Sequence, residues 1–309
     1  MKEQTGFTLI ELLIALALGL VIVAAAAMLF LTGLRSSSMQ QGVSDLQDNA
    51  NFGLNYITQD IRLANLNNIA ARIDDQLEFG GVVVSENNYP LEMKPQPDPD
   101  NPADIPAFNQ NLLSFSGTGL SNVAQGSDQL VIQYQPTRTG GFDCEGREIV
   151  DTNRIIVQRY FLRVDDNAAV TEANPLALAC DAGSYVDGSR TIDNFGDAGE
   201  IIMKRVDQFR VLFNVVNNAG QHRYIDADDY MRLANKPRII GVSLGALTRS
   251  SQNVGTDNAI AQNNRFRLLD QWLSVEDDGN PTGYIRRVVT QNVTLRNALG
   301  SREEEQDAK

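Results

Sequence analysis

A carboxylate stands at the beginning of a long apolar segment, where its negative charge needs a hydrogen-bonding or positively charged partner. Glu11 follows Phe7 by four positions and directly precedes residues 12–31, a run of twenty residues without a charge or a proline. An isolated ionised carboxylate in such surroundings costs on the order of several kcal/mol. The sequence therefore predicts a partner group for Glu11.

The two cysteines can form either a disulfide or a pair of buried thiols. Cys144 and Cys180 stand 36 positions apart without a CxxC pairing, and the chain has a single histidine. A zinc site needs more thiol or imidazole ligands than this, so no metal and no cofactor is expected. If this part of the chain lies outside the cytoplasm, a disulfide worth about 3 to 4 kcal/mol is expected. Two buried free thiols are the alternative.

Residues that could catalyse a reaction lack the neighbours that catalysis needs. His222 lies in a polar turn without a serine or cysteine nucleophile placed for activation. Glu145 and Glu148 are paired carboxylates, but Trp272 is the single tryptophan and no stacking aromatics accompany them. Three further carboxylates are expected to be solvated: Asp226, Asp228 and Asp229. We expect no enzymatic activity and no small-molecule substrate.

The charge of the chain argues against a nucleic-acid partner. There are 26 Lys and Arg against 39 Asp and Glu, which gives a formal net charge of −13. The basic residues are scattered singly or in pairs such as Arg286 and Arg287, so no basic stripe can follow a phosphate backbone. Direct binding of nucleic acid is not expected.

The apolar run is long enough to cross a membrane. As a helix that rises about 1.5 Å per residue, residues 12–31 cover a hydrocarbon core of roughly 30 Å. A cleaved secretory signal is the alternative, with the alanines at 24–27 as its cleavage site. Such signals usually have an apolar core of about 7 to 15 residues, whereas here residues 28–31 continue the hydrophobic pattern. The sequence predicts a membrane helix.

The first residues resemble the signature of type IV prepilins. Residues 2–11, KEQTGFTLIE, have the family's short charged leader, a glycine, a phenylalanine, and a glutamate as fifth residue of the mature chain. The resemblance implies that prepilin peptidase cuts after Gly6 and methylates the new amino group of Phe7. The Phe7 ammonium of one subunit can then pair with Glu11 of a neighbour, which would fix the register between subunits.

Beyond the apolar run the pattern predicts a helix packed on a sheet. Apolar residues recur at spacings of three and four from Met39 to Ala64, on one face of a helix. The proline-rich stretch Glu86 to Asn109 is expected to be an exposed loop. Runs of period two predict strands at 129–135, 154–164, 200–216, 238–248 and 284–296. This is an α+β fold of the type IV pilin kind, a helical stem on an antiparallel sheet.

The expected organisation has four parts. They are a leader at residues 1–6, a transmembrane and filament-core helix at 7–34, an amphipathic helix at 35–68 and a β-rich periplasmic head at 69–309. Whether the head is one domain or two stays open.

Three further stretches narrow the resemblance to the PilW-like minor pilins: residues 46–64, residues 206–213 with 237–250, and residues 286–297. Many relatives have an acidic turn between two of these strands, whereas residues 214–224 here lack the carboxylates of a calcium loop, so no metal is expected there. The resemblance implies a minor pilin that helps to start type IV pilus assembly and ends at the pilus tip.

The partners implied are other minor pilins, the major pilin, prepilin peptidase and the inner-membrane assembly platform. The expected location is the inner membrane, with one span and a periplasmic head, and then the cell-surface pilus. One alternative is a minor pseudopilin of a type II secretion system, similar to GspJ. The other is a membrane-anchored periplasmic binding module that never polymerises, with the proline-rich loop as its recognition surface. Glu11 argues against the latter, because a simple anchor does not need it.

Overall fold

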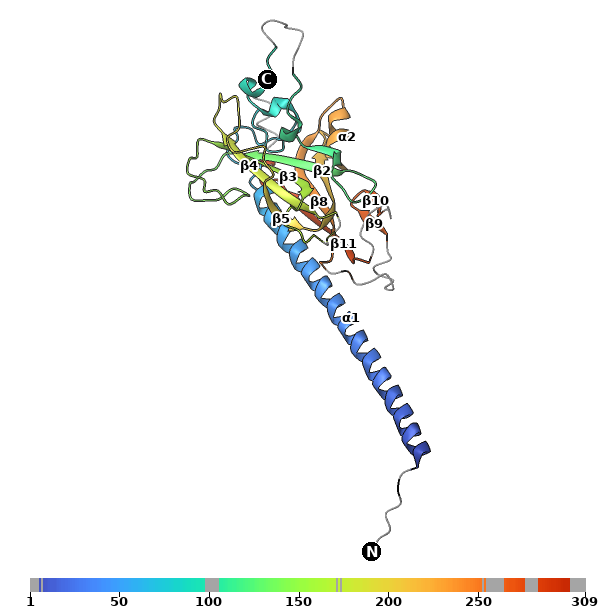
Figure 1. The fold of residues 1–309 in the computed structure, drawn as a ribbon. Coiled ribbons are helices and arrows are strands. Elements are labelled where there is room, and N and C mark those ends of the chain that lie inside the picture. The colour runs from blue at the N-terminus through green and yellow to red at the C-terminus, as the bar shows by residue number, and fades with distance from the viewer. Residues whose placement is uncertain are drawn as a thin grey trace.

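A long helical stem carries a head of β-sheets (Figure 1). The computed structural model describes residue 6 and residues 8–97, 106–170, 172, 174–251, 253, 264–275 and 283–300. The stem is helix α1, Leu9–Ile61, which is continuous over 53 residues. Its first half projects away from the head, and its second half lies against the sheets. The expected α+β class, with a long apolar helix followed by antiparallel sheets, is confirmed.

The strands of the head form three antiparallel sheets in the described part of the chain. A five-stranded sheet has the order β1-β2-β3-β4-β5, a four-stranded sheet has the order β11-β8-β6-β7, and β10 pairs with β9 alone. The strands are β1 (Phe115–Gly119), β2 (Ser127–Tyr134), β3 (Ile155–Val164), β4 (Leu176–Tyr185), β5 (Glu200–Lys204), β6 (Val206–Val216), β7 (His222–Ile225), β8 (Arg238–Arg249), β9 (Arg265–Leu268), β10 (Gln271–Ser274) and β11 (Arg286–Thr294). The short helices are α2 (Ala227–Arg232) and the 3-10 turns η1 (Glu86–Asn88), η2 (Leu91–Met93), η3 (Gln110–Leu112) and η4 (Arg296–Ala298).

One continuous hydrophobic core joins the stem to both large sheets. It contains Leu54 and Ile57 from α1, Leu178 from β4, and Phe213 from β6, all 5% exposed or less. Alternate residues of β6 point into this core, as expected for a strand with one face toward it. The second half of α1 is therefore part of the core and not an external support.

The long run at 200–216 is divided into two strands. Arg205 takes a φ of 57°, a left-handed conformation that no regular strand can include, so β5 ends at Lys204 and β6 begins at Val206. The two strands belong to different sheets, with β5 beside β4 and β6 beside β8. The prediction of a single strand over residues 200–216 is therefore wrong.

Helix α1 ends before residue 68, the boundary that the amphipathic pattern suggested. Asn65 and Asn67 have φ values of 64° and 59°, which end the helix. Asn65 is buried, and its side chain donates to Ala70 O at 2.9 Å and to Asn297 O at 3.0 Å. These long-range contacts hold a turn where the apolar spacing alone predicts more helix.

The proline-rich stretch is only partly an exposed loop. Residues 98–105 lie outside the described residues. Before them, η1 and η2 interrupt the segment, and Asn88 and Tyr89 are buried at 0% and 1% exposure. Asn88 accepts hydrogen bonds from the backbone of Val84 and Ser85. Hydrogen bonding by this asparagine, which prolines do not prevent, folds the beginning of the stretch into the head.

Candidate assembly surface

The carboxylate of Glu11 caps the beginning of its own helix. Thr8 is the N-cap of α1, and Glu11 N donates to its hydroxyl at 3.3 Å. In return, Glu11 Oε2 accepts from Thr8 N at 2.9 Å and from Thr8 Oγ1 at 2.8 Å. This reciprocal arrangement is a capping box. It supplies one partner within the chain, which we did not expect, although the spacing Thr-x-x-Glu at residues 8–11 is its usual signal.

The expected processing site also includes Gly6 and Phe7. Gly6 is exposed and has open space around it, with no heavy atom within 4 Å of the position that a Cβ would take. Phe7 lies outside the described residues. Cleavage after Gly6, methylation of Phe7 and the role of Glu11 in subunit contacts therefore stay predictions.

The first half of the stem exposes an almost wholly apolar surface. From Leu9 to Leu34 every residue is exposed, and an 18-residue window of the helix has a mean hydropathy of 2.9. Large apolar side chains in this half, such as Leu20 (62%) and Phe30 (67%), are mostly exposed. An apolar helix of this length needs lipid or other helices around it, because water would leave its side chains unfavourably hydrated.

The second half of the stem is fixed to the head through one helix face. Its buried positions recur every three or four residues: Gly42, Leu46, Ala50, Gly53, Leu54, Ile57, Thr58 and Ile61. Gly53 permits close approach, since a Cβ there would lie 2.9 Å from the Cβ of Met203 on β5. The apolar face that the spacing predicted is the face that packs.

Two asparagine side chains complete the joint by bonding to backbone. Asn49 Nδ2 donates to Lys204 O at 2.7 Å, and Lys204 N donates to Asn49 Oδ1 at 3.2 Å, so the amide pairs with the edge of β5 as a further strand would. At the other end, Asn297 Nδ2 donates to Ala64 O at 3.1 Å and Arg62 O at 3.3 Å. These carbonyls at the helix end would otherwise lack a donor.

A half-buried acid, Asp60, lies where the last turn of α1 meets the five-stranded sheet. Tyr160 Oη on β3 donates to Asp60 Oδ2 at 3.0 Å. Burial raises the pKa of Asp60 to about 6; the hydrogen bond from Tyr160 opposes this shift, and the nearby carboxylate of Asp143 adds to it. Asp60 belongs to the half of α1 that packs in the head, outside the apolar half. Its contact with the sheet is not visible in the apolar spacing of the helix, which does not include Asp60.

The expected disulfide is confirmed. Cys144 and Cys180 are bonded with their Cα atoms 6.1 Å apart, and both lie in the main core. The bond attaches the loop before β3 to β4. Tyr56 Oη of the stem donates to Cys144 O at 3.2 Å, so the bridged loop is also in contact with α1.

The carboxylates beside the disulfide are neutralised by arginines. Glu145, Asp181 and Asp197 bring oxygens within 4.8 Å of one another. However, Arg147 pairs with Glu145, and Arg159 NH2 lies 2.8 Å from Asp181 Oδ2. Guanidinium groups thus supply the positive charge here, and the cluster connects the disulfide loop with β3 and β4.

In the acidic run at 226–229, Asp226 and Asp228 are half-buried, contrary to our expectation of solvated side chains, whereas Asp229 is exposed as expected. Asp226 caps α2 and accepts from Arg210 at 2.9 Å, and Asp229 pairs with Arg232 at 2.8 Å. His222, expected in a turn, is the first residue of β7, exposed, with Nδ1 3.4 Å from Asn214 Oδ1. None of these contacts resembles a catalytic arrangement.

Comparisons with known families fit this architecture. A family model described as a prokaryotic N-terminal methylation motif matches residues 1–27, and one described as Type IV Pilus-assembly protein W matches residues 160–297. Together, these two matches support a type IV minor pilin of the PilW family. The expected resemblance is thus confirmed, and the family is one of structural pilins.

Both models describe type IV pilin-like proteins, a kind of protein for which assembly with other pilus components and processing by prepilin peptidase are implied. The methylation motif together with the apolar helix indicates a membrane anchor and association with a pilus. A solved type IV-like pilin from Thermus thermophilus is 13% identical, with 82% of this chain and 96% of that chain covered and a TM-score of 0.39. No curated protein matches the chain.

Proposed function

We propose that this PilW-family chain is a minor pilin that enters a type IV pilus and helps to initiate its assembly together with other minor pilins. The observation that carries the proposal is the division of α1. One half is built into the head, and the other half exposes a continuous apolar surface from Leu9 to Leu34. Such a surface suits lipid before assembly and the helices of other subunits after it.

In this proposal the chain is cut after Gly6 and methylated on Phe7, and it first stands in the inner membrane with the head in the periplasm. The major pilin, other minor pilins and the assembly platform are its partners, and the pilus tip is its destination. The capping box keeps one oxygen of Glu11 engaged with Thr8. The remaining oxygen is free to meet the Phe7 ammonium of a neighbouring subunit, which would neutralise the carboxylate in the filament interior.

Three substitutions separate a role of Glu11 in pairing from its role in capping. Glu11→Gln retains a side-chain acceptor for Thr8 but removes the charge, Thr8→Ala removes the cap but retains the charge, and Glu11→Ala removes both. If intersubunit pairing matters, Glu11→Gln and Glu11→Ala both reduce recovery in sheared pili at least tenfold, whereas Thr8→Ala enters pili. The opposite pattern, a defect in Thr8→Ala and none in Glu11→Gln, would assign Glu11 to capping alone.

The mature N-terminus provides the second test. Mass spectrometry of the chain purified from membranes should find methylated Phe7 in the wild type and in all three variants. Two observations would instead indicate a plain membrane anchor. They are a purified chain that still has residues 1–6, and normal pili in cells from which the whole protein has been deleted. Complementation of a pilus-defective strain and of a secretion-defective strain distinguishes the pilus role from that of a type II secretion pseudopilin, and we expect rescue of the former.

A further inference from the structure

Strand β7 leaves one edge of the four-stranded sheet open. Among the described residues it pairs with β6 alone. At the hairpin turn Asn217 N donates to Gln221 O at 3.1 Å, so these two residues form a hydrogen-bonded pair. Hydrogen-bonded and non-bonded pairs alternate along antiparallel strands, so the next hydrogen-bonded pair is Val215 with Arg223. His222 and Tyr224 therefore direct their backbone N–H and C=O groups outward. Both residues are exposed, Tyr224 at 54%.

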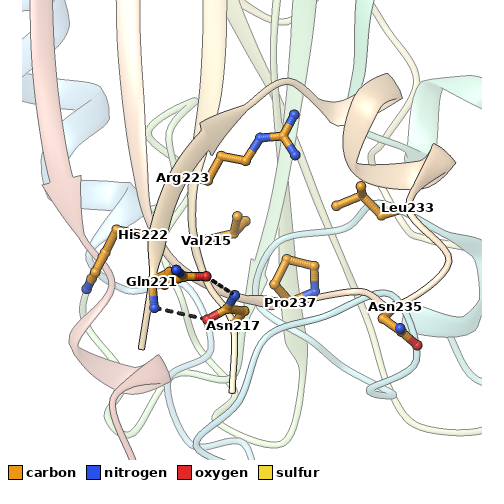
Figure 2. A pocket seen from close by; sticks show the side chains of 8 residues that line it. All are labelled: Val215, Asn217, Gln221, His222, Arg223, Leu233, Asn235 and Pro237. Atoms are coloured by element: carbon orange, nitrogen blue, oxygen red, sulfur yellow. Dashed lines mark hydrogen bonds between the residues drawn. The ribbon is translucent and has the colours of Figure 1, made fainter. Parts of the chain in front are cut away.

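A shallow pocket lies beside this edge (Figure 2). Its floor is apolar and consists of Val215, Leu233 and Pro237. The side chain of Arg223 extends across the pocket from β7, and Asn235 stands on the opposite side, on the loop that follows α2. Three other polar residues line the pocket, and two of them, Asn217 and Gln221, bond to each other, while the third is His222. The guanidinium of Arg223 is the group here best suited to a carboxylate.

The positive charge of Arg223 is not neutralised by the nearby acids. The three carboxylates that follow it in the chain are engaged elsewhere: Asp226 with Arg210, Asp228 with Ser116 N at 3.3 Å, and Asp229 with Arg232. No ion pair joins Arg223 to a carboxylate within the described residues. In a chain with a net charge of −13, this strand edge contains no acid and carries one uncompensated guanidinium.

We propose that β7 and its pocket bind an extended acidic segment of a partner pilin by strand addition. The backbone of the segment would bond to the outward groups of His222 and Tyr224, and a carboxylate would reach Arg223. This inference rests on the proposed function, since it names a contact by which that function recruits a neighbour. Helix α2, which directly follows β7, lies at the end of the head away from the stem, where a subunit stacked on the head would meet it (Figure 1).

The geometry also specifies a pattern for the segment. Side chains alternate between the two faces of a strand, so the residue opposite Arg223 faces the pocket and its two neighbours face the other side. On that other side Tyr224 exposes its ring. The segment recognised is therefore an acidic residue flanked on each side by an apolar one.

The test uses three synthetic eight-residue peptides and the full-length mature protein in detergent micelles. The first peptide has one glutamate between two valines, the second has glutamine in its place, and the third is the glutamate peptide N-methylated at alternate amides. Fluorescence anisotropy should give roughly tenfold tighter binding for glutamate than for glutamine, the effect of one charge-assisted pair. The N-methylated peptide should not bind, because it cannot bond to a strand edge.

Variants locate the binding. Arg223→Glu and the milder Arg223→Gln should each remove the preference for glutamate, and Tyr224→Pro should abolish binding because it removes an outward N–H without touching the bonds to β6. Arg138→Glu is the matched control, since Arg138 is an exposed arginine in another loop and the charge change is the same. It should leave all affinities unchanged, and circular dichroism verifies that each variant is folded.

Several outcomes would overturn the inference. They are equal affinities for the glutamate and glutamine peptides, undiminished binding of the N-methylated peptide, an equal loss in Arg138→Glu, and no binding of the glutamate peptide at millimolar concentration. The measurement needs no filament, so it fails or succeeds separately from the proposed function. Arg223→Glu is expected to be processed and methylated normally, and Glu11→Ala is expected to bind the peptide as the wild type does.

Discussion

Asp60 makes the attachment of the stem sensitive to pH in a direction opposite to that of most carboxylates. Its pKa in the folded chain is raised to about 6 from an ordinary value of 3.8, mainly by burial. A raised pKa means that the folded state binds the proton more tightly than the unfolded state does. The contribution of Asp60 to stability is therefore most favourable below pH 4 and is lost as the pH rises through 6.

The size of the effect follows from the difference of about two pKa units. At 1.36 kcal/mol per unit, ionised Asp60 destabilises the folded chain by about 3 kcal/mol relative to its protonated form. Asn in place of Asp60 can still accept the hydrogen bond from Tyr160, which is 3.0 Å away, but it carries no charge. Asp60→Asn should thus be more stable than the wild type by up to about 3 kcal/mol at pH 8 and nearly equal to it at pH 4.

Urea unfolding of the mature chain in detergent, followed by tryptophan fluorescence from pH 4 to pH 8, measures this difference. Asp48→Asn is the control, because Asp48 is an exposed acid on the same helix. Its free energy of unfolding should follow the wild-type curve. If the free energies of unfolding of Asp60→Asn and the wild type differ by the same amount at every pH in this range, ionisation of Asp60 does not destabilise the folded chain. That result would refute the reasoning.

Two further predictions concern the same joint. Replacing both Cys144 and Cys180 with serine should lower the free energy of unfolding by about 4 kcal/mol, as loop closure over 36 residues predicts, and a loss below about 1 kcal/mol in non-reducing urea titrations would contradict this. Asn49→Ala removes two hydrogen bonds to Lys204 and should lower the free energy of unfolding by about 1 to 2 kcal/mol. Asn51→Ala is the control, because Asn51 is exposed and the gain in helix propensity is the same, and it should not lower the free energy of unfolding. Equal effects of the two alanines in the same titrations would mean that the pairing with β5 contributes no stability.

Features encoded by local pattern could be predicted from the sequence. The uncharged run at residues 12–31 and the spacing of Leu46, Leu54 and Ile57 determine the stem and its packed face, because helix periodicity shows in neighbouring residues. The disulfide followed from a count of two cysteines and from the expectation that this part of the chain lies outside the cytoplasm. The strands β2, β3, β8 and β11 contain runs of β-branched and other apolar residues, so their positions were predicted within a few residues.

Features that depend on distant residues could not be predicted. Strand β4 has the sequence LALACDAGSY, whose small residues resemble a loop, and it becomes a strand because β3 and β5 pair with it on both sides. The contact of Asp60 could not be predicted, because the hydrogen bond comes from Tyr160, which is 100 positions away in the sequence. The open edge at β7 and the pocket beside it appear only when the order of strands is known.

The course of the stem through the core also determines how this subunit would respond to traction. To withdraw the helix from Leu46 to Ile61, on the order of 24 Å of packed surface must slide free at once, and the asparagine bonds at both ends of that stretch oppose the movement. Tension applied to the apolar half is therefore carried as shear into both sheets and across the disulfide. Stem and head should yield as one mechanical unit.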